Sequence, residues 1–107
     1  MDVESDFVDV GLAGMWRVME CIDAIGQHPV VIVVAGMDAA LPTVVGGLVA
    51  SVVFAVPTST GYGVAAGGET ALRAVLASCS PGLSVMNIDN GYGAACAALR
   101  VLRAIDV

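Results

Sequence analysis

Three short segments of the sequence combine glycines with hydroxyl, carboxylate or amide side chains. They span residues 36–40, 57–63 and 89–93, and each follows an almost purely apolar run. Glycine lets backbone N–H groups approach an anion, and a helix that begins after such a turn adds a favourable dipole. We therefore expect the segments to bind a phosphate or carboxylate group, although each one alone could be an ordinary turn between a strand and a helix.

The same segments supply candidate substrate-binding residues and a candidate acid–base group. Asp38 follows a predicted buried strand with no basic residue nearby in sequence, so burial would favour its protonated form and suit it to proton transfer. Asp38 could instead cap the helix that follows, and Asp89 has the same two interpretations. The residues expected to bind the substrate are Gly36, Met37, Thr58, Ser59, Thr60, Gly61, Tyr62, Gly63, Asn87, Asp89, Asn90 and Gly91.

The cysteines offer a second kind of chemistry. Cys79 lies at the end of a predicted helix, between two serines, and could be a nucleophile or a small buried residue. Cys21 and Cys96 fall inside predicted helices and are expected to be core residues. Three cysteines give no disulfide framework and are typical of a reducing cytoplasm. Because there is one histidine, His28, which we expect in a turn, and no CxxC motif, we expect no metal site.

The periodicity of the apolar residues predicts how these groups are positioned. Helices are expected over residues 12–22, 41–50, 68–78 and 94–105, and buried strands over residues 29–35, 52–56 and 83–88. This alternation predicts a three-layer αβα domain with a parallel sheet. Ligands of such sheets bind beyond the carboxyl ends of the strands, which is where the three polar segments should meet.

Composition narrows the classes of partner. The chain has 107 residues, enough for one domain, of which 58% are apolar and 13% charged, so we expect apolar surface to be buried in a homo-oligomer. A net charge of −6, with four arginines and no lysine, argues against nucleic acid. Residues 39–68 carry no charge, but proline, glycine and a Thr-Ser-Thr run interrupt them, so we expect no membrane span. Residues 1–10 should form a frayed acidic segment, or a docking tail.

Four blocks of the sequence resemble LarB proteins, which are PurE-like carboxylases of nickel-pincer cofactor biosynthesis. The blocks cover residues 34–49, 56–63, 76–82 and 85–94, and the likeness extends from about residue 9 to the end of the chain. The resemblance implies that residues 11–107 form the C-terminal part of a flavodoxin-like, PurE-like domain that assembles into an octamer. About three strands are present, whereas the family also has an earlier strand, phosphate-binding turn and helix.

The resemblance also implies a reaction. The family carboxylates the pyridinium ring of nicotinic acid adenine dinucleotide and hydrolyses its phosphoanhydride, releasing AMP. Carbon dioxide or bicarbonate is the co-substrate, no cofactor is expected to be tightly bound, and a requirement for Mg²⁺ is left open. The position of Cys79 implies a thiolate that adds to the ring, and the position of Asp38 implies the acidic residue beside the reacting centre.

Departures from the family pattern leave alternatives open. The family carries Glu-Gly where this chain has Asp38-Ala39, which retracts the carboxylate by roughly 1.5 Å, about one single bond. A separate chain could supply the missing N-terminal half. Alternatives are the carboxylase or mutase reaction on aminoimidazole ribonucleotide, and a non-catalytic nucleotide-binding module. We also expect the helix before Cys79 to carry it to the amino end of the sheet, so that it serves the site of a neighbouring subunit.

Overall fold

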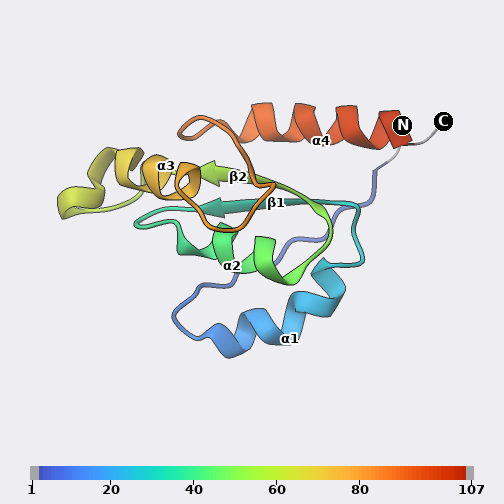
Figure 1. Cartoon of the computed structure of the whole chain (residues 1–107), viewed down its shortest axis with the longest axis horizontal. Coiled ribbons are helices and arrows are strands. Elements are labelled where there is room, and N and C mark those ends of the chain that lie inside the picture. The colour runs from blue at the N-terminus through green and yellow to red at the C-terminus, as the bar shows by residue number, and fades with distance from the viewer. Residues whose placement is uncertain (1–2, 106–107) are drawn as a thin grey trace.

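The computed structural model describes residues 3–105, in which helices cover both faces of a parallel sheet (Figure 1). The elements are α1 (Met15–Ile25), β1 (Val30–Ala35), α2 (Ala40–Leu48), β2 (Val52–Pro57), the 3₁₀ segment η1 (Gly63–Gly68), α3 (Glu69–Leu76), β3 (Ser84–Val85) and α4 (Gly91–Ile105). The sheet order is β1-β2-β3 and both pairs are parallel. The predicted three-layer αβα architecture is therefore confirmed.

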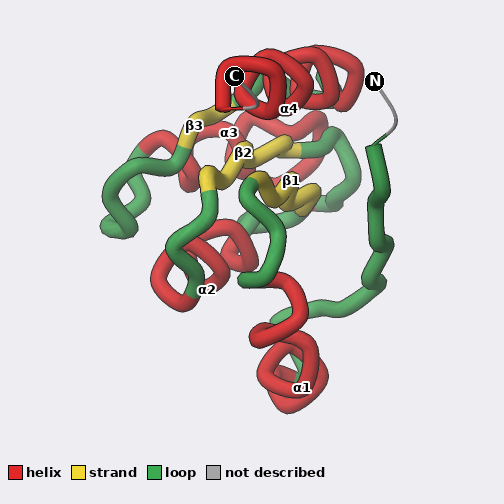
Figure 2. Tube along the Cα trace, turned by 90° about the vertical axis from the view of Figure 1, so that its right-hand side faces the viewer, coloured by secondary structure: helices red, strands yellow, loops and turns green. Residues whose placement is uncertain are grey.

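Strand β2 is the interior strand, as its apolar sequence on both faces predicts. On one face Phe54 and Val56 pack against Ala94 of α4. On the other face Val53 packs with residues of β1 and α2, and Ala55 packs with residues of α3. Figure 2 looks almost along the strands and shows α4 on one side of the sheet and α2 on the other.

Helix α1 differs from its expected packing. Its apolar spacing includes Met15, Trp16 and Met19, yet these side chains are exposed, and the buried residue of the helix is Val18. Figure 2 shows α1 at the periphery of the molecule, farther from the sheet than α2. The exposed apolar side chains agree with the expectation of an oligomer but do not test it.

The third strand is much shorter than expected. The apolar run predicts a strand over residues 83–88, but β3 contains only Ser84 and Val85. Beyond β3 the N–H of Met86 still donates to Ala55 O at 2.9 Å, and then the Asn87 side chain accepts a hydrogen bond from the N–H of Ile88, which turns the chain. Local side-chain hydrogen bonding thus replaces the end of the strand.

Smaller expectations have mixed outcomes. His28 lies in the turn before β1, as predicted, and its carbonyl accepts a hydrogen bond from Ser51 at 2.5 Å. Cys21 and Cys96 lie within helices, but both are only partly buried, so the prediction that they are core residues is wrong for the chain by itself. None of the helices within residues 3–105 is both long and apolar enough to cross a membrane.

Candidate functional site at the carboxyl edge of the sheet

The three polar segments meet at the carboxyl edge of the sheet, as predicted. The N–H of Met37 in the first segment donates to Thr60 O in the second, at 3.0 Å. The N–H of Ser59 donates to Asp89 Oδ1 at 2.9 Å, and the N–H of Asp89 donates to Pro57 O at 2.9 Å. In Figure 1 the three segments follow the strands at this end, where the β1 and β2 arrowheads lie. Loop residues from distant parts of the sequence thereby form one surface.

Two glycines permit the close contact between these segments. A Cβ on Gly36 would lie 2.7 Å from Thr58 Oγ1, and one on Gly68 would lie 2.7 Å from Ile88 Cγ2. Gly68 also has φ +90°, a conformation that side chains other than glycine rarely adopt. These glycines therefore serve the packing of loop on loop, in addition to any contact with a ligand.

Asp38 is exposed, so the burial expected for it is absent in the single chain. It is not the N-cap of α2 either, because that position is Ala39, and no side chain caps the helix. Met37 and Ala39, on either side of Asp38, have φ values of +53° and +47°. Such left-handed backbone is unfavourable for residues with a Cβ and is typical of functional loops. Asp38 is thus held on a strained turn, beside first-turn N–H groups of α2 that an anion could use.

Asp89 fastens two loops together and does not act as a helix cap. Hydrogen bonds from the hydroxyl of Ser59 and, with a smaller effect, from its backbone N–H lower the pKa of the Asp89 carboxyl below its usual value of 3.8. The cap of α4 is Asn90, whose Oδ1 accepts from the N–H of Gly93 at 2.9 Å. Because Asp89 stays ionised near neutral pH, it suits a structural or binding role better than proton transfer.

The remaining predicted binding residues form an open rim. Thr58 and Gly61 are half-buried, whereas Thr60, Tyr62, Gly63, Asn87 and Gly91 are exposed. Tyr92, absent from the predicted set, is also exposed on the third segment, 83% against 77% for Tyr62. Two tyrosines on neighbouring segments could flank a planar ring. The Gly-Tyr-Gly pattern occurs in both segments, and this repeat was the signal by which Tyr92 could have been added to the predicted binding residues.

Cys79 is exposed, in a turn that packs against α2. The side chains of Ser78 and Thr43 are hydrogen-bonded at 2.6 Å, and Ser80 Oγ donates to Thr43 O at 2.6 Å. Thr43 is in the first half of α2, only five positions beyond Asp38. Ser80 also lies beside Gly46 and Gly47 in the second half of α2, so the expectation that Cys79 reaches the amino end of the sheet stays a prediction. Helix α3 has only 8 residues and β3 pairs first with Phe54, so the intervening turn lies beside α2.

Sequence reasoning missed the role of Thr43 in holding the cysteine turn. Only the fold brings this helix residue to Ser78 and Ser80, which follow it by more than thirty positions. Within residues 3–105 no hydrogen bond joins Asp38 to Cys79. Asp38 thus lies on the turn before α2 and Cys79 on a turn that packs against α2, with no hydrogen bond between them.

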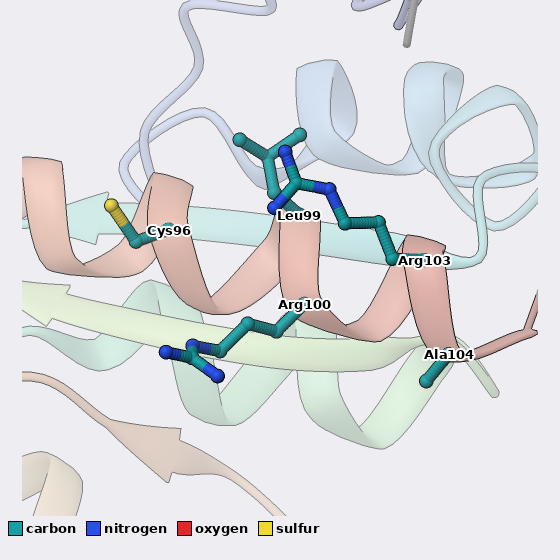
Figure 3. A pocket seen from close by; sticks show the side chains of 5 residues that line it. All are labelled: Cys96, Leu99, Arg100, Arg103 and Ala104. Atoms are coloured by element: carbon teal, nitrogen blue, oxygen red, sulfur yellow. The ribbon is translucent and has the colours of Figure 1, made fainter.

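A hollow on the surface lies away from this edge. It measures about 650 Å³ and is lined by Cys96, Leu99, Arg100, Arg103 and Ala104. Figure 3 shows that all these side chains come from α4, with Arg100 and Arg103 pointing apart. Because the lining residues belong to a single helix, no second element encloses a ligand there. The carboxyl edge remains the better candidate, as a surface that is open in the single chain.

The sequence is similar to one known protein family and to one curated protein. A sequence model of the family described as AIR carboxylase matches residues 13–107. An uncharacterized protein of Methanocaldococcus jannaschii is 48% identical over 88 residues, which is 80% of this chain and 33% of that protein. The chain therefore spans about a third of the length of the curated relative it matches.

Proposed function

We propose, on the basis that the chain belongs to the AIR carboxylase family, that it carries the catalytic part of a LarB-type carboxylase. The substrate would be nicotinic acid adenine dinucleotide, carboxylated on its pyridinium ring and cleaved at its phosphoanhydride. The observation that carries the proposal is the hydrogen-bonded carboxyl edge, with an exposed cysteine turn anchored to the helix that follows Asp38.

The proposed chemistry starts at Cys79. Its thiolate adds to the electron-poor pyridinium ring, which becomes a neutral dihydropyridine. Ring carbon 5, the enamine carbon β to the ring nitrogen, is then nucleophilic. That carbon bonds to carbon dioxide. Loss of the proton from the same carbon and departure of the thiolate then restore the aromatic ring, so the net change replaces a ring hydrogen by a carboxylate and releases one proton.

Asp38 is the residue we propose to accept that proton. Its carboxylate lies on the turn between β1 and α2, and the cysteine turn packs on the same helix. A general base needs a position within hydrogen-bonding reach of its proton, and contacts in an unliganded site are often longer than in the working complex. An oligomer offers a second arrangement, in which Cys79 of one subunit serves the Asp38 of its neighbour.

The loops would bind the phosphates and carboxylates of the dinucleotide. The chain has few cations, so backbone N–H groups must do much of this work. The uncapped start of α2 and the glycine-rich turns supply such groups, and the helix dipole favours an anion there. Tyr62 and Tyr92, both exposed on these loops, would stack against the flat ring.

The family description favours a second candidate, carboxylation of aminoimidazole ribonucleotide. Members with that activity carry histidines in the site, including one before Leu-Pro, where this chain has Ala40 before Leu41-Pro42. The one histidine of this chain, His28, precedes β1 and so lies at the opposite edge of the sheet from the loops. The chemistry available in the chain therefore fits the cysteine-dependent reaction better.

The test is incubation of the purified chain with nicotinic acid adenine dinucleotide and labelled bicarbonate. We expect label in the nucleotide product, release of AMP, and loss of both in Cys79→Ser but not in the matched control Cys21→Ser. Label transferred to aminoimidazole ribonucleotide instead would establish the second candidate. Nucleotide binding without any turnover would contradict both reactions and identify a non-catalytic module.

A mixing experiment tests whether the site is shared between subunits. Inactive Cys79→Ser and Asp38→Asn chains are combined, dissociated and reassembled. If each site takes its cysteine and its carboxylate from different chains, mixed oligomers regain part of the parental activity. If no activity returns although mixed oligomers form, both residues must come from one chain.

A further inference from the structure

The turn that carries Cys79 is fastened to α2 on both sides of the cysteine. Ser78 and Ser80 are half-buried, and both are hydrogen-bonded to Thr43 of α2. Cys79 lies between them and is exposed. Because the residues before and after Cys79 are both held against the helix, the turn presents the thiol on its outer side.

The hydrogen bonds form a closed network on Thr43. Thr43 Oγ1 and Ser78 Oγ lie 2.6 Å apart, Ser80 Oγ donates to Thr43 O at 2.6 Å, and the N–H of Ser80 donates to Ser78 Oγ at 3.2 Å. The first two distances are at the short end of the range for O–H···O bonds. Thr43 therefore contributes twice, through its hydroxyl and through its carbonyl. A change of its side chain removes the first bond and keeps the second, so the hydroxyl can be tested by itself.

Little else in the backbone holds this turn. The N–H of Ser78 donates to Val75 O at 3.4 Å, at the end of α3, and pairing with β2 begins again only at Ser84. Among the described residues, no backbone–backbone hydrogen bond outside the helices and strands involves residues 79–83. The side-chain network on Thr43 is thus the main restraint on the residue that carries the thiol.

Helix α2 leaves room for the turn to approach. Gly46 lies inside this helix, where glycine is less favourable than alanine. A Cβ at Gly46 would lie 2.7 Å from Leu83 Cδ2 and 3.4 Å from Ser80 Cβ. The helix therefore lacks a side chain at the point where the turn packs against it, and the serines can reach Thr43.

We propose that Thr43 is a positioning residue for Cys79, and that its hydroxyl, acting through Ser78, fixes the direction in which the thiol meets its substrate. Thr43 itself touches no reacting atom. A thiolate that adds to a ring carbon needs a defined approach, and a displacement of about 1 Å can cost on the order of a hundredfold in rate. The use made of the thiol rests on the proposed function, whereas the orientation of the Cys79 side chain can be measured without any substrate.

The first test compares Thr43→Val, which removes the hydroxyl, with Thr43→Ser, which keeps it, in the full chain. A nitroxide spin label is attached to Cys79 in chains that also carry Cys21→Ser and Cys96→Ser, and its motion is followed by electron paramagnetic resonance. We expect a restrained label in the parent and a shift to faster motion in Thr43→Val. Thr43→Ser should return the label to the parental motion.

Carboxylation by the unlabelled chains is the second test. Thr43→Val should lower kcat for incorporation of labelled bicarbonate by about tenfold or more and change KM little, because the network affects the thiol and not the loops that would bind the nucleotide. Thr43→Ser should recover most of the rate. The control Ser51→Ala loses a bond of the same kind, from a serine hydroxyl to the carbonyl of His28 at 2.5 Å, outside the network on Thr43. It should change neither kcat nor the motion of the label.

Several outcomes overturn the proposal. Equal motion of the label in the parent and in Thr43→Val does so, as does a folded Thr43→Val chain with the parental kcat, or a Thr43→Ser chain that behaves like Thr43→Val. If Thr43→Val fails to fold, Ser78→Ala breaks the same bond from the side of the turn and must loosen the label equally. A parent without carboxylase activity contradicts the proposed function, and faster label motion in Thr43→Val would still support the orienting role of Thr43.

Discussion

The carboxyl edge and the β1 edge of the same sheet differ in whether backbone groups within residues 3–105 form hydrogen bonds there. At the carboxyl edge, backbone groups of three loops bond to one another, and glycines let the loops touch. At the β1 edge, apolar side chains and backbone groups face a groove that nothing in residues 3–105 pairs with. The first edge is thus a hydrogen-bonded surface of loops, and the second is an apolar strand edge beside a groove.

The largest effect is expected where two loops touch at the carboxyl edge. Gly68→Ala forces a left-handed φ on alanine, which costs about 1–2 kcal/mol, and drives its Cβ against Ile88 and Thr58. We expect a loss of about 2–5 kcal/mol in the free energy of unfolding, measured by urea denaturation.

The neighbouring glycine provides the control. Gly67 has φ +85°, but no atom lies within 4 Å of the position that a Cβ would take there, so Gly67→Ala should cost only the conformational part, about 1–2 kcal/mol. Equal losses in the two variants would show that the loops do not depend on close packing.

The next effect concerns catalysis at the same edge. Asp38→Asn removes the proposed proton acceptor and should lower the carboxylation rate by on the order of a hundredfold. Asp38→Glu restores the length of side chain that the resemblance implies and should keep or raise the rate. Rates of label incorporation from bicarbonate measure both, and nucleotide affinity serves as the control. An Asn variant with the parental rate would remove Asp38 from the mechanism.

Two adjacent valines of β1 differ strongly in burial and so test how much burial contributes to stability at this strand. Val33 is 5% exposed and Val34 is 56% exposed. Val33→Ala should reduce the free energy of unfolding by about 2–3 kcal/mol, and Val34→Ala by less than about 1 kcal/mol. Urea denaturation measures both, and equal costs for the two variants would contradict the difference in burial.

Much of the fold could be predicted from the sequence because it depends on local patterns. The uncharged β-branched run of β1 and the apolar run of β2 indicate interior strands, and the helical spacing indicates α4. What could not be predicted is where a run stops pairing. Strand β3 ends early where Asn87 and Asp89 turn the chain, and α1 exposes Met15 and Trp16 because it lies at the periphery of the fold.

The site was predictable in its location but not in its roles. Parallel strands bring their carboxyl ends together, so the meeting of the loops followed from topology. Asn90 rather than Asp89 caps α4 because the helix begins at Gly91, a boundary that the apolar pattern does not specify. The position of Cys79 depends on the length of α3 and on Thr43, which is distant in sequence. Roles that arise from long-range contacts need the structure.

A smaller effect concerns the Asp89 clamp and has a defined pH dependence. Hydrogen bonds from Ser59 lower the pKa of Asp89, so its stabilising contribution is present above the usual value of 3.8 and is lost as the pH falls through the lower folded value. Asp89→Ala should therefore lower the unfolding midpoint at neutral pH, and the difference from the parent should shrink well below 3.8. Asp23→Ala, at an exposed position of α1, is the control; a pH-independent difference at Asp89 would contradict an ionic clamp.

The smallest effect tests whether the strained turn is essential to the carboxyl edge. Ala39 has φ +47°, which glycine adopts freely, yet its methyl group is buried against Ala55 and Val75. Relief of about 1–2 kcal/mol of backbone strain is offset by loss of the buried methyl, about 0.8 kcal/mol, and by the greater flexibility of glycine when unfolded. Ala39→Gly should therefore change the free energy of unfolding by less than about 1 kcal/mol, measured by urea denaturation. A large loss in Ala39→Gly would mean that the buried methyl, and not the backbone, determines the shape of the turn that presents Asp38.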